Sequence, residues 1–185
     1  MILQKTRLLL WIPLLLGALS ANAQKYITKT GSVKFEASVP SFEEVAAENK
    51  STSAVLETAT GDFAALTLMK GFRFKLALME EHFNENYVES DKYPKASFKG
   101  KIEGFDASKV TTAEKAFTIT GELTLHGKTK KVSSTAKISK SGASYKITGS
   151  FMVKPEDFAI EIPKIVSKKV ANDIAVDYNF VLNKQ

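Results

Sequence analysis

The sequence predicts an all-β protein of about eight antiparallel strands, and three observations carry this prediction. Apolar and polar residues alternate with period two through most of the chain, as they do in strands that bury one face. Short segments that contain glycine and polar residues separate these stretches, as turns do. No stretch with helical periodicity is long enough for a major helix. Strands of this number and length suit either a sandwich or an up-and-down barrel.

The first 23 residues have the pattern of a secretory signal peptide. Lys5 and Arg7 precede an apolar run over residues 8–19, and small residues follow at 21 and 23. The run is shorter than the roughly 20 residues that a membrane-spanning helix needs. We therefore expect cleavage after Ala23 and no stable membrane insertion. The remaining residues 24–185 are expected to form one domain that is exported to the periplasm, with release outside the cell as the alternative.

The composition of residues 24–185 excludes several classes of function. These 162 residues carry 24 basic and 20 acidic side chains, without the dense basic patch of a nucleic-acid-binding protein. The absence of cysteine excludes thiolate catalysis and cysteine metal sites. The two histidines, His82 and His126, lie far apart and lack metal-ligand spacing. We expect no metal, no cofactor and no catalytic residues, so the sequence does not indicate an enzyme.

The first half of the domain is expected to contain strands with one helical interruption. A capping-box pattern, Ser41-Phe42-Glu43-Glu44, predicts a short helix from residue 41 to about residue 49. Alternation predicts strands over the ranges 26–39, 51–58, 63–70, with a possible extension over 72–75, and 95–105.

The second half shows the clearest alternation. It predicts three consecutive antiparallel strands over residues 115–154 and a last strand over residues 174–182. Turn residues separate the three strands at 126–128 and 140–142. Gly121 and Gly149 interrupt apolar faces of these strands, which we interpret as bends of the sheet in preference to ligand contacts.

Three segments of the chain resemble the signature of the YceI family, in order and at suitable spacing. The first segment is similar to the short helix and the yP-x-a-x-F strand of the family, and it reads MEEHFNENY at 79–87 and SDKYPKASFKG at 90–100. TGELTLHGKTK, at 120–130, is similar to its x-G-x-L-T-I-x-G-x-T-K hairpin. FMV with DFAI, at 151–153 and 157–160, is similar to F-x-V-x-x-x-D-F-G-I, with Ala159 where glycine is usual. The serine- and histidine-bearing first strand of the family is not found here.

The resemblance implies a single extended, eight-stranded antiparallel, lipocalin-like barrel with one or two short helices. It also implies a periplasmic location and a long apolar cavity for an isoprenoid lipid, such as a polyprenyl chain or a quinone tail. Residues 76–88 would form a short helix, because Leu76, Met79, Phe83 and Tyr87 share one helical face. That face either lines the cavity or packs as ordinary core.

The function expected from these observations is to carry or sequester an apolar lipid without catalysis. Mixtures of phenylalanine and methionine, which suit adaptable apolar cavities, are concentrated between residues 63 and 83. The alternative is a barrel filled by its own side chains, acting as a periplasmic protein-interaction or stress-protection module. The residues expected to line the cavity are Leu66, Leu68, Phe72, Phe74, Leu76, Met79, Phe83, Tyr87, Phe98, Phe158 and Ile160.

Overall fold

The computed structural model describes residues 24–185, so the predicted signal peptide lies outside the described part of the chain. Strands make up most of it, and they are β1 (Lys25–Ser38), β2 (Ala46–Glu57), β3 (Asp62–Leu68), β4 (Arg73–Phe74), β5 (Lys95–Ile102), β6 (Lys115–Leu125), β7 (Lys128–Ser141), β8 (Ser144–Val153) and β9 (Val170–Lys184). The helical segments are α1 (Ala77–His82), the π-helical η2 (Phe83–Tyr87) and the 3₁₀ turns η1 (Met69–Gly71), η3 (Ala107–Lys109) and η4 (Pro155–Phe158).

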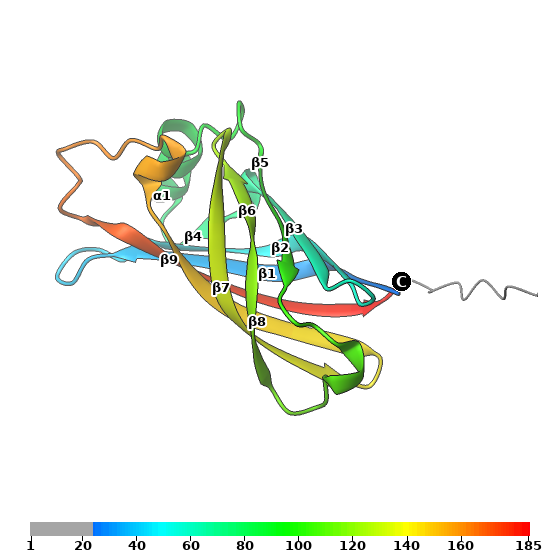
Figure 1. The fold of residues 1–185 in the computed structure, drawn as a ribbon. Coiled ribbons are helices and arrows are strands. Elements are labelled where there is room, and N and C mark those ends of the chain that lie inside the picture. The colour runs from blue at the N-terminus through cyan, green and yellow to red at the C-terminus, as the bar shows by residue number, and fades with distance from the viewer. Residues whose placement is uncertain (1–23) are drawn as a thin grey trace, which may run out of the picture.

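The strands form one closed antiparallel barrel (Figure 1). Their order is β1-β9-β8-β7-β6-β5-β3-β2, and pairing of β2 with β1 closes the ring. The short β4 adds no further wall position, because it pairs with the part of β2 that β3 does not reach. β3 and β4 together therefore act as one strand interrupted by η1. The predicted eight-stranded antiparallel barrel is confirmed.

The three predicted consecutive strands over residues 115–154 are also present, as β6, β7 and β8. Leu125 pairs with Lys128 across a two-residue turn made by His126 and Gly127. Both turn residues have positive φ, 49° and 70°, as in the type I′ turns that match the twist of a hairpin. Local turn chemistry thus sets the register of this part of the wall.

The helix predicted over residues 41–49 is wrong. Residues 39–45 form the turn of the β1–β2 hairpin, and β2 begins at Ala46. Ala47 and Asn49 are buried, and Asn49 pairs with Val33 of β1. Sheet pairing along the whole of β1 overrides the local capping-box pattern, as tertiary contacts commonly override helix propensity.

The helix predicted over residues 76–88 is confirmed, with slightly different ends. α1 begins at Ala77 and continues without a break into η2, which ends at Tyr87. Leu76 is the residue before the helix and has extended backbone angles. A π-helical turn inside a helix commonly accompanies a functional site.

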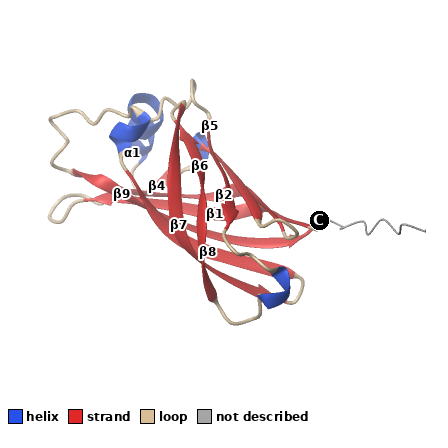
Figure 2. Ribbon diagram, in the orientation of Figure 1, coloured by secondary structure: helices blue, strands red, loops and turns tan. Residues whose placement is uncertain are grey.

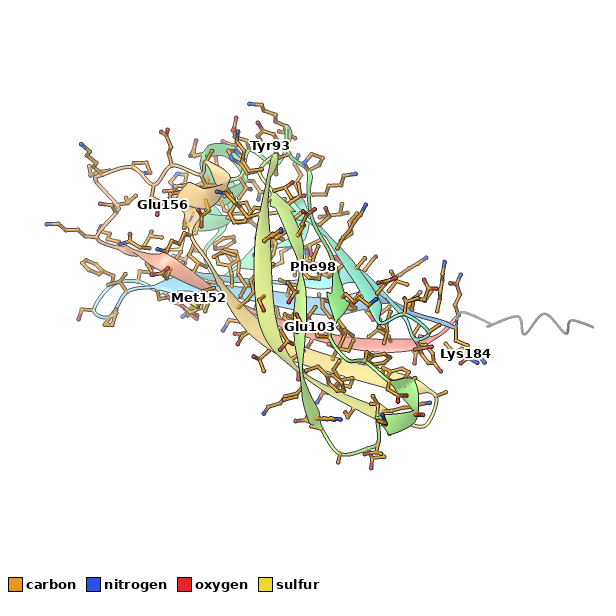
Figure 3. The ribbon with its side chains drawn as sticks, viewed as in Figure 1. Tyr93, Phe98, Glu103, Met152, Glu156 and Lys184 are labelled. Carbon is orange, nitrogen blue, oxygen red and sulfur yellow. The ribbon has the colours of Figure 1, made fainter. Side chains whose placement is uncertain are left out.

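The two ends of the barrel are built differently (Figure 2). One end, called here the helical end, carries α1, η2, η4 and the loop over residues 159–169. The other end carries the β2–β3 and β7–β8 hairpins, the 3₁₀ turn η3, and the start and finish of the described chain. Figure 3 shows Glu156 at the helical end and Lys184 at the opposite end.

Candidate functional site

The end of the barrel opposite the helical end is filled by its own side chains. Leu56, Ile102, Ile138, Ile147 and Leu182 are completely buried there and belong to one hydrophobic cluster. This cluster also contains a perpendicular pair of tyrosine rings from β1 and β8, with ring centroids 4.7 Å apart. These side chains pack against one another and fill this half of the barrel.

The half of the barrel nearer the helical end is hollow. A cavity of about 370 Å³ lies there, within the range of roughly 300–1,000 Å³ that is typical of ligand sites. Phe63, Ile119 and Phe180 belong both to the filled cluster and to the cavity lining, so they form the floor between the two halves. Inward-facing residues of β1, β3 and β5–β9 form the walls, and residues of η1, β4, α1, η2, η4 and neighbouring loops complete the lining.

The structure brings eight of the eleven predicted lining residues into this wall, namely Phe72, Phe74, Met79, Phe83, Tyr87, Phe98, Phe158 and Ile160. Figure 3 shows Phe98 among the strands of the barrel. These residues come from four separated parts of the chain, and the closed sheet is what gathers them. That they contact a ligand remains a proposal.

Leu66, Leu68 and Leu76 lie outside the cavity lining, and their predicted place in it is corrected. They are 38%, 53% and 39% exposed. Alternation along β3 turns Ala65 and Thr67 inward, so the two leucines between and after them face outward. Hydrophobicity alone favoured the leucines, whereas the strand period decides which side chains enter the barrel.

Many of the lining residues that the prediction omitted come from the later strands. Their signal was present, because the same period-two pattern that predicted these strands also marks one apolar face of each. They include Leu123, Leu125, Val132, Phe151, Val153, Ile174 and Val176. Ile162 and Val166 also line the cavity, but they lie in the loop over residues 159–169, where no regular period points to them.

Aromatic side chains from three elements close the cavity at the helical end. Phe35 of β1 lies with its ring centroid 5.5 Å from that of Phe72, 5.7 Å from Phe74 and 5.4 Å from Phe83. Such distances are those of favourable aromatic pairs. The apolar face of the helix therefore does both things that the sequence left as alternatives: it packs as core and it lines the cavity.

A small polar cluster lies in the mostly apolar wall. The Ser134 hydroxyl donates to the backbone oxygen of Ser150 at 2.8 Å, and the Tyr178 hydroxyl lies 2.8 Å from the same Ser134 oxygen. Since Ser134 has one proton and donates it to Ser150, Tyr178 is the donor to Ser134. Burial raises the pKa of Tyr178 above its ordinary value.

Glycine makes room for aromatic rings on the inner wall. A Cβ at Gly149 would lie 2.3 Å from the Tyr178 hydroxyl oxygen, and one at Gly121 would lie 2.7 Å from Phe98 Cζ. The structure thus places a side chain of the barrel itself against each of these glycines. The rings lie close to the sheet there, which leaves the centre of the cavity open.

His126 ties together two segments that bear lining residues. Its Nε2 lies 2.8 Å from a carboxylate oxygen of Glu89, and its Nδ1 lies 3.0 Å from the backbone oxygen of Phe158. The ring also packs edge-on against Tyr93 at 4.5 Å. The hydrogen bond from His126 is the main cause that lowers the pKa of Glu89, and Lys92 acts in the same direction. The β6–β7 turn thereby fastens η4 and the end of the α1–η2 helix.

Comparison with protein families gives one match over most of the chain. A model of the YceI-like domain matches residues 21–182. The chain belongs to the YceI-like family. A search of curated proteins returned no significant match.

Solved structures with the YceI-like fold include a polyisoprenoid-binding domain from Saccharophagus degradans, implicated in plant cell wall breakdown. It is 12% identical, with a TM-score of 0.76 over 87% of this chain and 98% of that chain. BcnA from Burkholderia cenocepacia is 17% identical, with a TM-score of 0.66 over 82% of this chain and 95% of that chain. The YceI protein from Campylobacter jejuni is 18% identical, with a TM-score of 0.60 over 74% of this chain and 83% of that chain. At these identities the likeness concerns the fold.

The residue that departs from the YceI pattern, Ala159, lies at the end of η4. Ala159, at the position where the family usually has glycine, has a φ of 54° and ends η4. Its N–H donates to the backbone oxygen of Glu156 at 3.1 Å. The left-handed conformation is one that glycine adopts without cost, so the turn is kept here despite a side chain that disfavours it.

Two further features bear on chemistry and on membranes. Within residues 24–185, no three histidine or carboxylate side chains come together in a way that could hold a metal ion. Over the same residues, no helix has the length and apolar character needed to span a bilayer.

Proposed function

We propose that this YceI-like protein is exported and holds an isoprenoid or another long apolar lipid in its barrel, without catalysing a reaction on it. The observation that carries the proposal is the contrast between the two halves of the barrel. The same fold that packs one half without space leaves about 370 Å³ in the other, lined almost wholly by apolar side chains. Burial of a lipid chain there would contribute roughly 0.8 kcal/mol for each CH₂ group.

The comparisons support a lipid as the ligand. The Saccharophagus protein with the same fold is described as a polyisoprenoid-binding domain. A polyprenyl or quinone tail has the shape that a long, narrow barrel accepts. Export is supported by the signal-peptide pattern over residues 1–23 and is part of the proposal. Few titratable groups line the cavity, which supports binding in preference to catalysis.

The alternative, a barrel filled by its own side chains, fits only the end opposite the helical end. It predicts that purified protein releases no lipid and does not bind apolar dyes. The direct test is mass spectrometry of an organic extract of the protein, purified natively from the exporting cell. A stoichiometric polyprenyl or quinone compound is the expected result, and an empty extract from folded protein would favour the filled barrel.

A matched pair of variants shows whether the lipid occupies this cavity. Ala65 of β3 lines it, so Ala65→Trp should fill part of the space and lower the lipid content severalfold. Ala64 precedes it on the same strand and faces the other way, so Ala64→Trp should keep the native content. Equal lipid content in the two folded variants would place the lipid elsewhere.

A further inference from the structure

The loop over residues 159–169, called here the edge loop, exposes an isoleucine at the corner of a turn. The Val166 N–H donates to the backbone oxygen of Pro163 at 2.9 Å, so Lys164 and Ile165 are the central residues of this turn. Ile165 is 88% exposed, the most exposed of the large apolar side chains in the described part of the chain. Glycine, proline and small polar residues are usual at turn corners, so the turn itself does not account for an isoleucine. Residues that break a local rule in this way are found mostly at functional sites.

A second apolar side chain projects from the neighbouring turn. Residues 39–45 form the turn of the β1–β2 hairpin, and Phe42 within it is 47% exposed. Ser38 of β1 pairs with Val170 of β9, so this turn and the edge loop leave adjacent strands at the same end of the barrel. Figure 1 shows both projecting beyond the barrel, the hairpin in light blue and the edge loop in orange. Ile165 and Phe42 are therefore exposed apolar residues of two neighbouring loops.

The edge loop is also basic. Its three lysines are Lys164, Lys168 and Lys169. All three are exposed, and none has a carboxylate within 4.0 Å among the described residues. The acidic residues nearby are Glu161 in the same loop and Glu43 and Glu44 in the hairpin turn, and Glu44 lies 3.9 Å from Lys75, which offsets its charge. The two loops together keep a small net positive charge, which is complementary to a membrane surface with anionic lipids.

The edge loop borders the cavity as well as the solvent. Ile162, Val166 and Lys169 belong to the cavity lining, whereas Ile165 lies outside it. Lys169 is itself exposed, so the cavity reaches solvent beside this loop. A lipid tail that crosses water loses the burial of each of its CH₂ groups, so a lipid carrier gains by exchanging its ligand at a bilayer surface. The edge loop is at the place where such an exchange would occur.

We propose that the turn over residues 163–166, with Phe42 beside it, docks the protein on the surface of a bilayer that carries anionic phospholipids. This inference rests on the proposed function, because a carrier of long-tailed lipids needs a bilayer with which to exchange them. Ile165 and Phe42 enter the interface, while the lysine ammonium groups stay at the level of the phosphates. The contact is peripheral and reversible, because two side chains bury little apolar surface. It sets the opening of the cavity against the membrane.

Tryptophan fluorescence tests the docking directly. The only tryptophan of the chain, Trp11, lies in the predicted signal peptide, so Ile165→Trp introduces the one tryptophan of the exported protein. Mixed vesicles of phosphatidylcholine and phosphatidylglycerol should shift its emission to shorter wavelength, and brominated lipids in the vesicles should quench it. Val181→Trp is the matched control, because Val181 is 49% exposed but precedes Leu182, which is completely buried in the filled end. Its emission should not change.

Co-sedimentation with vesicles measures the two contributions to binding. The native protein should bind the mixed vesicles about fivefold more tightly than pure phosphatidylcholine, as expected for about one net charge near the surface. Lys164→Gln/Lys168→Gln should abolish this preference, whereas Lys99→Gln/Lys101→Gln, which removes the same charge from exposed positions of β5, should keep it. Ile165→Ser should weaken binding to the mixed vesicles about tenfold, since it removes one aliphatic side chain from the interface.

The possible outcomes separate this inference from the proposed function. Unchanged emission of the Ile165→Trp protein with vesicles, while its organic extract still contains lipid, overturns the inference and leaves lipid binding standing. Equal shifts in the Ile165→Trp and Val181→Trp proteins overturn the docking orientation. If the Ile165→Trp protein inserts into vesicles but neither releases lipid nor binds an apolar dye, the proposed function fails, and the exchange of lipid at this surface fails with it.

Discussion

The contact between Gly149 and Tyr178 shows how single residues keep the barrel hollow. Gly149 lies on the inner face of β8, directly beneath the ring of Tyr178 from β9. The Tyr178 hydroxyl reaches across β8 to Ser134 on β7. Tyr178 also stacks on Phe180, with ring centroids 5.6 Å apart and an angle of 19° between the rings. One missing side chain therefore allows a ring to lie against the wall of the cavity.

Replacement of Gly149 by alanine should destabilise the protein by moving that ring. The new Cβ would lie 2.3 Å from the Tyr178 hydroxyl oxygen and 2.6 Å from its Cζ, so the ring must shift and the bond to Ser134 weakens. Overpacking of this kind costs about 1–3 kcal/mol in the free energy of unfolding, which urea denaturation measures. In a Tyr178→Leu protein the same substitution should cost clearly less. Additive effects of the two substitutions would contradict the contact.

At single residues, the sequence predicts a place in the cavity from two signals, apolar character and the period of the strand. Gly149 and Gly121 stand out as gaps in apolar faces, but the ring that fills each gap comes from another strand, and no local pattern names it. Apolar character predicts Leu68 in the cavity, whereas the period of its own strand turns it outward. For residues on strands, alternation is the better guide; for Ile162, in a loop, there is no strand period, and apolar character is the only signal.

At the scale of elements, the α1–η2 helix acts as a plug that is held by aromatic contacts. Phe83, at the start of η2, packs against Phe35 of β1, against Phe72 between η1 and β4, and against Phe74 of β4. Every one of these four rings also belongs to the cavity lining. The plug is therefore part of the cavity wall, and its packing is linked to the space that a ligand would use.

Phe83→Ala should lower the stability of the protein and loosen the helical end. Removal of a fully buried phenylalanine costs about 3–5 kcal/mol, and Phe83 is half-buried, so a loss of about 1–3 kcal/mol is expected. Leu78→Ala is the control in the same helix, because Leu78 is 61% exposed and its loss should change stability by less than about 0.5 kcal/mol. Urea denaturation measures both. Equal effects would mean that the helix does not pack through this face.

The link through His126 should make the helical end sensitive to acid. Hydrogen bonding from His126 lowers the pKa of Glu89 below 4.5, so the bond stabilises the fold above that pH and is lost as pH falls through the lower folded-state value. The native protein should therefore melt above Glu89→Gln at neutral pH, and the difference should shrink as pH falls below about 4.5. Thermal melting monitored by circular dichroism measures it. A difference that does not change with pH would argue against a role for the carboxylate charge.

Prediction of elements was most successful where local pattern and tertiary pairing agree. The α1–η2 helix has a helical apolar face that the barrel needs, and the β6–β7 hairpin has turn residues with the required positive φ. The segment over residues 41–49 is the opposite case. Its capping-box residues favour a helix start, but β1 offers partners along the whole of β2, and this pairing cannot be seen from the local sequence.

For the whole molecule, the barrel divides into a half that sets stability and a half that is available for function. Completely buried side chains concentrate at the filled end, whereas the helical end has a smaller buried cluster, which includes Met69, Phe72 and Val88, and is otherwise held by half-buried rings and a few polar links. Segments with few buried contacts open at lower free energy than the core. Under the proposed function, the helical end would open to admit a lipid while the rest of the barrel stays closed.

Native-state hydrogen exchange should show this division directly. Amides of β7 and β8 near Ile138 and Ile147 should exchange only through global unfolding, because these side chains are completely buried in the filled half. Amides of α1 and of the loop over residues 159–169 should exchange faster by local opening. Saturation with the isoprenoid alcohol farnesol should slow exchange at the helical end, since a ligand stabilises the state that binds it, and Ala65→Trp should abolish that protection. Uniform protection of both ends without ligand would mean that the barrel opens as one unit, and lipid entry would then require unfolding of the filled half as well.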